Sequence, residues 1–367
     1  MKFQSTLLTA LFVTTLSTGF SQADSSKGEL NFNAYIDLYY GYDLNQPYDN
    51  ERPDFLFNYG KHNQIGINLA LANWEYTKGK LTARLGFNFG DFPNRNMAHE
   101  QGLLKALYQA NVEYQFAKKA SFMMGMFGSH LGFESFASFE NLFISHSLAS
   151  EWTPYYQSGA RVTFNPNEKW TLSATVANGT QNITKIPGNT TPALGGQVAF
   201  SPNKNITINY SNLYVNDYPD SLAQFMFYNN LYATFTLMNK LDLVTGFDYG
   251  INNNTVLDTT NNIMVISFLA RYRFSEKWSV GFRAEHYDDP GSVYISTATI
   301  NPFVTQCYTV GLNYSPMDRV KFRIESRNFT AEKPFYRNDQ GTNPYATGTV
   351  QYINSNSNIL FSVQAKF

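Results

Sequence analysis

Hydrophobic and polar residues alternate with a period of two along much of the chain, and this pattern predicts β-strands. The C-terminal segment alternates most clearly: Ile359, Phe361, Val363, Ala365 and Phe367 are apolar, and Ser362, Gln364 and Lys366 lie between the last four of them. A strand that faces lipid alternates in this way, because among sheets only a closed barrel pairs every backbone amide within a bilayer. The C-terminus is therefore predicted to be the closing strand of a membrane barrel.

Four further segments alternate clearly enough to assign a face to each residue. The apolar face is predicted to contain Phe32, Ala34, Ile36, Leu38 and Tyr40; Ile65, Ile67, Leu69 and Leu71; Leu81, Ala83, Leu85, Phe87 and Phe89; and Ala106, Tyr108, Ala110, Val112 and Tyr114. The register stays open in 122–127, around Val265 and Leu269 on the predicted lumen side, and in 349–357.

The connections between these strands fall into two classes. Short polar turns are predicted at 77–80, 117–120, 165–169, 202–205, 238–240, 275–277 and 315–319. Longer connections alternate with them at 43–62, 90–103, 128–155, 179–192, 215–223, 252–262, 288–302 and 330–347. Together they join about sixteen antiparallel strands, which is the size of an outer-membrane β-barrel with an aqueous channel. Both termini fall on the side of the short turns.

Aromatic residues gather beside the short turns, as expected for an interfacial girdle. The set is Trp74, Tyr76, Tyr114, Phe116, Phe164, Trp170, Tyr272, Phe274, Trp278 and Tyr314. A soluble all-β sandwich or propeller is the alternative, but it gives no reason for three of the four tryptophans to lie beside one class of turn.

The N-terminus has the features of an export signal. Lys2 precedes an apolar stretch at 7–16, and Ser21-Gln22-Ala23 supplies small residues at the spacing of a signal-peptidase site. We predict a signal peptide at 1–23 and a porin barrel domain at 24–367, with the mature chain beginning near Asp24. An N-terminal anchor helix is the alternative, but the apolar stretch is too short to span a bilayer.

Composition excludes several classes of protein. The chain has 27 basic and 28 acidic residues, so it offers no electrostatic field for nucleic acid. Mean hydropathy is −0.32, and no apolar run reaches the 18 or so residues that a spanning helix needs. The single cysteine, Cys307, excludes a disulfide framework and a paired-cysteine metal or redox motif. We expect no cofactor and no metal.

One stretch resembles a known family. It includes Gly125-Met126-Phe127, Gly132-Phe133-Glu134, Asn141 and Pro154-Tyr155-Tyr156-Gln157-Ser158-Gly159. This stretch, 125–164, resembles the OmpL-like beta-barrel porin family around its third extracellular loop. The resemblance implies a channel with that loop, about 128–155, folded inward. His146 stands where many members have arginine. The C-terminal Phe367 resembles the last residue of the signal that the barrel-assembly machinery recognises. Ala365 replaces the aromatic residue that often stands third from the end of that signal.

Charged residues on the predicted lumen face suggest a filter. The basic wall is predicted to contain Arg271, Arg273, Arg283, Lys321, Arg323 and Arg327, with Glu285 and Glu325 between them. The third loop supplies Glu134, Glu140 and Glu151, and in a sixteen-strand barrel its root lies opposite that wall. Opposed charges across a narrow passage would orient solutes and select ions. The alternative is that these charges only brace the wall.

Candidates for catalysis are few. His62, His99, His130 and His146 lie in predicted loops, and His286 with Asp288 and Asp289 ends a strand. An outer-membrane phospholipase or protease would need such a group at the rim, so His286 beside Asp288 is its candidate. A structural or adhesin barrel would favour long repetitive loops, which the chain lacks. The sequence favours a porin for small hydrophilic solutes or ions, with outer-membrane lipid and lipopolysaccharide around it and a homotrimer as the assembly that general porins suggest.

Overall fold

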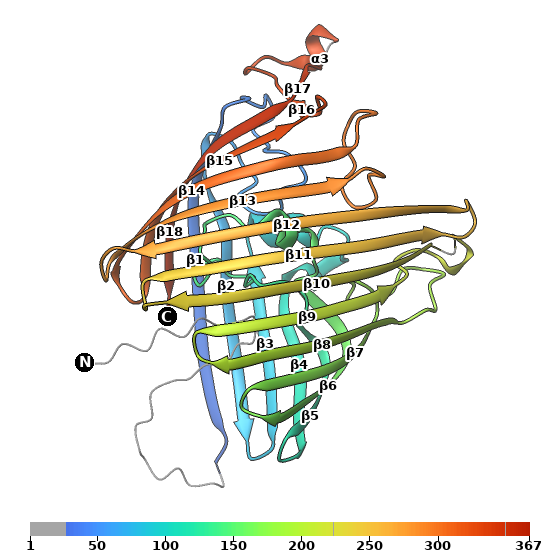
Figure 1. The fold of residues 1–367 in the computed structure, drawn as a ribbon, viewed down its shortest axis with the longest axis vertical. Coiled ribbons are helices and arrows are strands. Elements are labelled where there is room, and N and C mark those ends of the chain that lie inside the picture. Colours follow the sequence, from blue (N-terminus) through green and yellow to red (C-terminus); the bar gives the residue numbers. More distant parts are fainter. Residues whose placement is uncertain (1–26, 223, 349) are drawn as a thin grey trace.

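A computed structural model describes residues 27–222, 224–348 and 350–367, and its main feature is one closed antiparallel barrel (Figure 1). The sixteen barrel strands are β1 (Glu29–Asp43), β2 (Gln64–Lys78), β3 (Leu81–Phe89), β4 (Leu107–Ala117), β5 (Ala120–Gly128), β6 (Tyr156–Asn167), β7 (Trp170–Ala177), β8 (Ala193–Asn203), β9 (Ile206–Val215), β10 (Gln224–Leu237), β11 (Leu241–Asn254), β12 (Thr259–Arg273), β13 (Trp278–Asp289), β14 (Phe303–Met317), β15 (Val320–Ala331) and β18 (Ser355–Lys366). Each strand pairs with its neighbour in sequence, and β18 pairs with β1 to close the sheet. The predicted sixteen-strand barrel is confirmed.

The remaining elements are short and lie in the connections. They are α1 (Asp91–Asn96), η1 (Gly102–Ala106), α2 (Leu148–Trp152), η2 (Asp220–Leu222), α3 (Pro344–Thr347) and a small hairpin of β16 (Tyr336–Arg337) with β17 (Tyr352–Ile353). Among the described residues, no helix has the length and apolar character to cross a membrane. The hairpin takes up part of the uncertain segment 349–357, and β18 begins at Ser355.

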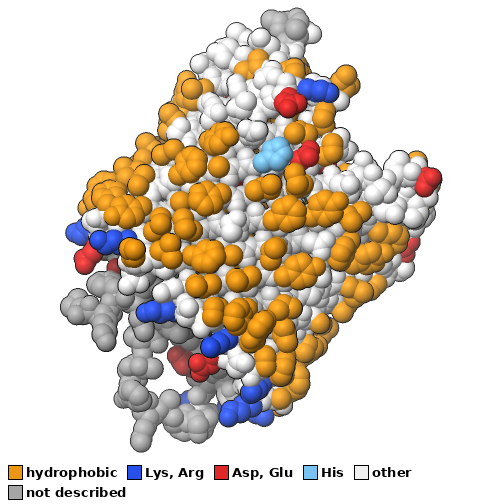
Figure 2. All heavy atoms as spheres, in the orientation of Figure 1, with side chains coloured by type: hydrophobic (Ala, Val, Ile, Leu, Met, Phe, Trp, Pro, Cys, Tyr) orange, Lys and Arg blue, Asp and Glu red, His pale blue; other side chains and the backbone are white. Residues whose placement is uncertain are grey.

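Alternation along the strands divides the barrel into an apolar outside and a mostly polar inside. In β15, Phe322 and Ile324 point outward and are 38% and 46% exposed, whereas the intervening Arg323 is 2% exposed and points inward. Apolar side chains consequently cover the outer wall over β9–β15 (Figure 2). Closure leaves the sixteen-strand sheet without an edge, and its apolar outer face suits a wall surrounded by lipid.

Two β-bulges reverse part of the face assignment predicted from sequence. Between β1 and β2, Asp37 pairs with Leu69 but the next residue, Leu38, pairs with Ile67. Asn68 is therefore an extra residue in β2, and the side chains of β2 switch faces at this point. Leu69 and Leu71 therefore point inward, where they pack near Phe139. A second bulge at Tyr108 turns its ring inward against Phe136. The predicted outward positions of Leu69, Leu71 and Tyr108 were wrong, because strict alternation does not register an inserted residue.

Val265 and Leu269 lie on the lumen side of β12, as their positions in the strand require, and each is 1% exposed. Leu269 packs against Leu142 and Phe143 of the connection between β5 and β6. These apolar lumen positions are thus a packing surface for a segment inside the barrel.

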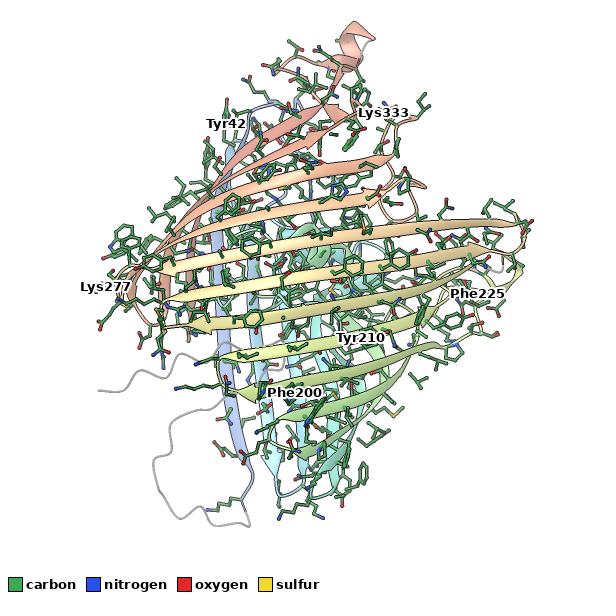
Figure 3. The ribbon with its side chains drawn as sticks, in the orientation of Figure 1. Tyr42, Phe200, Tyr210, Phe225, Lys277 and Lys333 are labelled. Carbon is green, nitrogen blue, oxygen red and sulfur yellow. The ribbon has the colours of Figure 1, made fainter. Side chains whose placement is uncertain are left out.

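Aromatic pairs bridge neighbouring strands beside the short turns. The rings of Trp170 and Phe200 are 4.4 Å apart, and those of Trp278 and Tyr314 are 4.5 Å apart. Figure 3 labels Phe200 of β8 and Lys277, the turn residue that precedes Trp278. The predicted aromatic girdle at the short-turn end is confirmed for these strands.

Candidate functional site

The connection between β5 and β6, residues 129–155, folds into the barrel and is called loop 3 here. Its first part follows β8–β11: the His130 ring lies 2.9 Å from the backbone oxygen of Asn212, and the amide of Gly132 donates to Asn230 at 3.1 Å. Phe133 then packs edge-on to Tyr232 of β10. Loop 3 therefore follows the inner wall away from its root instead of extending into solvent.

The middle of loop 3 binds the far wall. The amides of Ile144 and Ser145 donate to Oε2 of Glu325 at 2.8 and 3.2 Å. Phe143 lies over Gly281 and Gly311 on the lumen faces of β13 and β14, where a β-carbon at Gly281 would come within 2.8 Å of the ring. The two glycines thus make room for an aromatic anchor.

Three arginines of the predicted basic wall hold this part of the loop. Arg283, Arg323 and Arg327 are at most 2% exposed. Arg283 donates to the backbone oxygen of Ser145 at 2.8 Å and lies over the Phe143 ring, and Arg323 donates to the backbone oxygen of Ser138 at 2.8 Å. Arg327 pairs with Glu285 at 3.0 Å. Because they are paired and covered, these arginines do not line open lumen.

Two of the three predicted acidic residues are also buried. Glu134 accepts hydrogen bonds from the amide and the hydroxyl of Ser147, both at 2.7 Å, and Glu151 accepts one from the amide of Phe57 at 3.0 Å. Burial raises the pKa of Glu134 and raises that of Glu151 to about 7. Both carboxyl groups are enclosed in packed structure, so they do not face open lumen.

The connection between β1 and β2, residues 44–63 and called loop 1 here, packs over loop 3. The Tyr59 hydroxyl donates to Asp37 of β1 at 2.7 Å and lies 2.8 Å from the Ser138 hydroxyl. Phe55 packs edge-on against Phe303 and Phe329. Loop 1 thus adds a second layer within the long-loop half of the barrel.

The remaining predicted charges are partly exposed at the short-turn side of loop 3. The side chain of Glu140 is 48% exposed and forms an ion pair with Lys366 of β18. Lys321 lies with its Nζ 4.2 Å from the centre of the Phe139 ring. Arg271 and Arg273 share the carboxylate of Asp242.

Sequence reasoning missed several lumen charges. Lys366 and Asp242 belong to the groups just described, and Arg84 pairs with Glu75 and Glu113 at 2.6 and 2.9 Å on the β2–β4 wall. All five occupy inward positions of the alternation, so the period-two pattern could have identified them.

Comparison with known proteins agrees with this geometry. Residues 29–367, which include the whole barrel, match the family described as "Putative beta-barrel porin-2, OmpL-like". The chain belongs to this porin family.

Solved barrels share the fold of the porin at low sequence identity. An anion-selective porin from Comamonas acidovorans is 10% identical, with a TM-score of 0.60 over 93% of this chain and 100% of that one. Salmonella typhi OmpF in complex with daunomycin is 10% identical, with a TM-score of 0.61 over 92% and 97% of the two chains. Vibrio cholerae OmpT in a trimer form is 8% identical, with a TM-score of 0.57 over 93% and 99%. No protein of curated function matches the sequence.

Of the three catalytic candidates in this porin, Asp289 lies on the opposite face of the sheet from the other two. His286 and Asp288 lie on the outer face of β13, whereas Asp289 points inward and accepts the amides of Val293 and Ile295 at 2.8 and 3.0 Å. Across the strands, His286 faces Ile266 and Gln306, neither of which is a nucleophile. Within the described residues, no three His, Cys, Asp or Glu side chains are grouped as metal ligands.

Each of the four loop histidines packs against or lies beside other residues of the long connections and strands. His130 and His146 lie within loop 3, and burial lowers their pKa values to about 4 and about 3, so both are neutral at physiological pH. His62 packs against the Tyr42 ring, and His99 lies beside Glu100.

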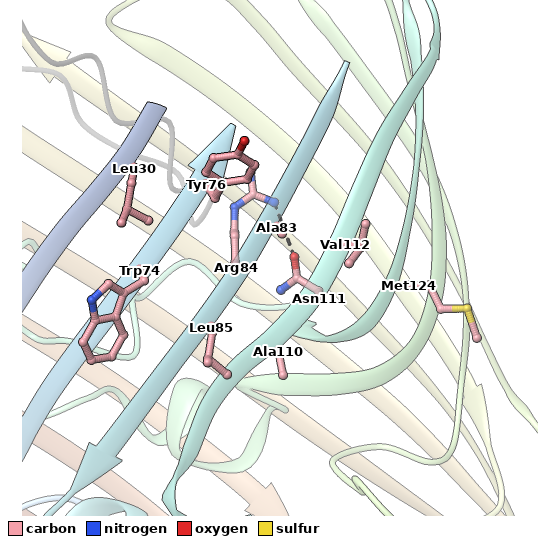
Figure 4. A pocket seen from close by; sticks show the side chains of 10 residues that line it. All are labelled: Leu30, Trp74, Tyr76, Ala83, Arg84, Leu85, Ala110, Asn111, Val112 and Met124. Carbon is pink, nitrogen blue, oxygen red and sulfur yellow. Dashed lines mark hydrogen bonds between the residues drawn. The ribbon is translucent and has the colours of Figure 1, made fainter. Parts of the chain in front are cut away.

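A hollow of about 400 Å³ lies on the outer wall over β1–β5 (Figure 4). Trp74, Leu85, Val112 and Met124, which help to line it, belong to the outward-facing set and are 37% to 63% exposed. The hollow is therefore on the lipid side of the wall, separate from the lumen.

Proposed function

We propose that this porin is a water-filled channel for passive diffusion of small hydrophilic solutes and ions, with loop 3 as its constriction. The observation that carries the proposal is the position of loop 3, which crosses from β5–β6 to Glu325 and Arg283 inside a barrel that is apolar outside. A packed segment across the lumen narrows the passage, and polar walls beside it suit hydrated solutes.

The predicted charges divide into two roles under this proposal. Glu134, Glu151, Arg283, Arg323 and Arg327 are buried and hold loop 3 and loop 1 in place. Glu140, Arg271, Arg273 and Lys321 remain partly exposed and would face passing solutes. We therefore assign solute contact to the second set, with Lys366 added.

The surroundings of the channel are proposals as well. We propose an outer-membrane location, reached after removal of residues 1–23, which lie outside the described residues. Outer-membrane lipid and lipopolysaccharide would surround the apolar wall, and the barrel-assembly machinery would read the segment that ends at Phe367. The trimer form of the Vibrio cholerae relative supports a homotrimer.

Catalysis is not part of the proposal. His286 and Asp288 reach the outer face without a serine, threonine or cysteine opposite them in the adjacent strands. A hydrolase of the outer membrane would need a positioned nucleophile or activated water at such a site.

Planar bilayers test the proposal directly. The purified full chain should give stepwise conductance, and sugars above a size limit should be excluded in liposome swelling. Deletion of 137–143 should raise both conductance and the size limit, while a deletion of equal length at 183–189 should leave both unchanged. Absence of conductance in correctly folded, heat-modifiable protein would refute the channel; equal effects of the two deletions would refute loop 3 as the constriction.

A further inference from the structure

Four cationic side chains lie on the lumen face at the short-turn end of the barrel, and two of them contact loop 3. We call Arg271, Arg273, Lys321 and Lys366 the basic cluster. Arg271 and Arg273 lie at the end of β12, Lys321 is the second residue of β15, and Lys366 is the last residue of β18. All four point inward beside the short turns, so a solute that enters or leaves at this end passes them.

Phe139 of loop 3 fixes the two lysines. The Nζ atoms of Lys321 and Lys366 lie 4.2 and 4.5 Å from the centre of the Phe139 ring, and Lys321 also donates to the backbone oxygen of Phe139. An ammonium group over an aromatic face is attracted to the ring. Phe139 therefore holds two positive charges close together near Glu140.

The cluster contains more basic than acidic side chains. Its four basic side chains lie near two acidic side chains, Asp242 and Glu140. Asp242 is fully buried and is held by both arginines, so it stays in place. Glu140 is about half exposed, and among the described residues it forms an ion pair only with Lys366, so its carboxylate is free to move away from the lysine.

Glu140 shows which chemistry the cluster accepts. Partial burial by itself would raise the pKa of this carboxyl group, but Lys321, Lys366 and Arg271 together hold the pKa below its ordinary value. A carboxylate is thus already stabilised at this position by charges from three strands. Within the described residues, Nη1 of Arg271 has no hydrogen-bond partner and is available to a further oxygen.

We propose that the basic cluster is a binding site for small oxyanions, meaning solutes with carboxylate or phosphate oxygens, and that Glu140 is a tethered competitor that an arriving oxyanion displaces. The inference rests on the proposed channel and specifies its solute class. Displacement keeps the site occupied by negative charge, so a solute exchanges with Glu140 without leaving the lysines unpaired. Competition of this kind also limits affinity, which allows the solute to leave again.

The test compares charge variants of the full chain in planar bilayers, with chloride as the carrier and citrate or inorganic phosphate added as a blocker. The channel with both Lys321→Gln and Lys366→Gln should bind each oxyanion about five-fold more weakly than the wild type. This loss of affinity corresponds to about 1 kcal/mol. Glu140→Gln should change affinity in the opposite direction by a similar factor. Lys118→Gln, which removes an exposed lysine at a short turn outside the cluster, is the matched control and should match the wild type.

The direction of the Glu140→Gln effect decides between a binding site and a brace. If Glu140 and the lysines only hold loop 3, both variants should disturb the constriction in the same way, and that result would overturn the inference. Affinities equal to the Lys118→Gln control would overturn it too. Block by citrate but not phosphate, or the reverse, would assign the site to one oxyanion source.

Calorimetric titration of citrate into the folded barrel in detergent separates this inference from the proposed function. Citrate binding that Glu140→Gln strengthens, in a barrel without conductance, would support the site while refuting the channel. Conductance without any oxyanion binding would leave the channel standing and refute the site.

Discussion

At the scale of residues, burial decides what each charge of the lumen does. Glu134 and Glu151 differ from Glu140 by position in one loop, yet the first two are closed off by Ser147 and Phe57 while the third reaches water. Desolvating a carboxylate is costly, so burial raises the pKa of both Glu134 and Glu151. The same distinction separates Arg323, covered by loop 3, from the partly exposed Arg271.

The buried carboxyl of Glu151 predicts a pH-dependent stability. Its pKa of about 7 in the folded protein exceeds the ordinary value of 4.5, so the folded state binds a proton that the unfolded chain has released. The free energy of unfolding should therefore fall as pH rises from about 4.5 to above 7. Glu134, also raised, should contribute in the same direction.

Glu151→Gln keeps a hydrogen-bond acceptor for the amide of Phe57 but cannot ionise. The midpoint of heat-induced unfolding, followed by heat-modified gel mobility, should therefore depend less on pH between 5 and 8 in this variant than in the wild type. Glu140→Gln is the control, because the pKa of Glu140 is lowered and its loss should not flatten this slope. An unchanged slope in Glu151→Gln would show that this carboxyl does not titrate in the fold.

At the scale of elements, loop 3 depends on features of the strands that it touches. Gly281 and Gly311 lack the side chains that would displace Phe143, and Leu69 and Tyr108 are turned inward by bulges to meet Phe139 and Phe136. Bulges commonly redirect a side chain in this way. The strands are therefore shaped to hold one conformation of the loop.

Gly281→Val should loosen the middle of loop 3. The new side chain would overlap the Phe143 ring, and overpacking of this kind costs about 1 to 3 kcal/mol. We expect noisier single-channel current and faster proteolysis of loop 3 in the folded barrel. Gly196→Val is the matched control, since its side chain would join the outward row of Leu194 and Val198. Quiet channels from both variants would show that Phe143 does not anchor the loop.

At the scale of the whole molecule, the short turns lie at one end of the barrel and the long connections lie at the other. β1 and β18 close the sheet, and the amide of Phe367 donates to the backbone oxygen of Ala34 at 2.9 Å, so the C-terminus lies with the short turns (Figure 1). Ile186 belongs to a long connection, and Asn167 lies at a short turn between β6 and β7. The two positions should face opposite sides of the membrane.

Cysteine labelling of intact cells checks this arrangement. A cysteine at position 186 should react with an impermeant maleimide, and one at position 167 should react only after the cells are opened. The native Cys307 is buried against Arg327 and should give little background. Equal labelling of both positions in intact cells would refute the sidedness and the strand count behind it.

The sequence by itself determined the number of strands, their order, the placement of both termini with the short turns and the inward direction of the six basic-wall residues. These follow from local alternation and turn chemistry, which each segment carries independently of its partners. Tertiary structure decided which inward-facing charged side chains remain exposed to solvent, where bulges reverse the face of a strand, and how loop 3 crosses the lumen. Leu69, Glu134 and Arg323 show why: their environments come from residues far away in sequence, and a period of two contains no information about such contacts.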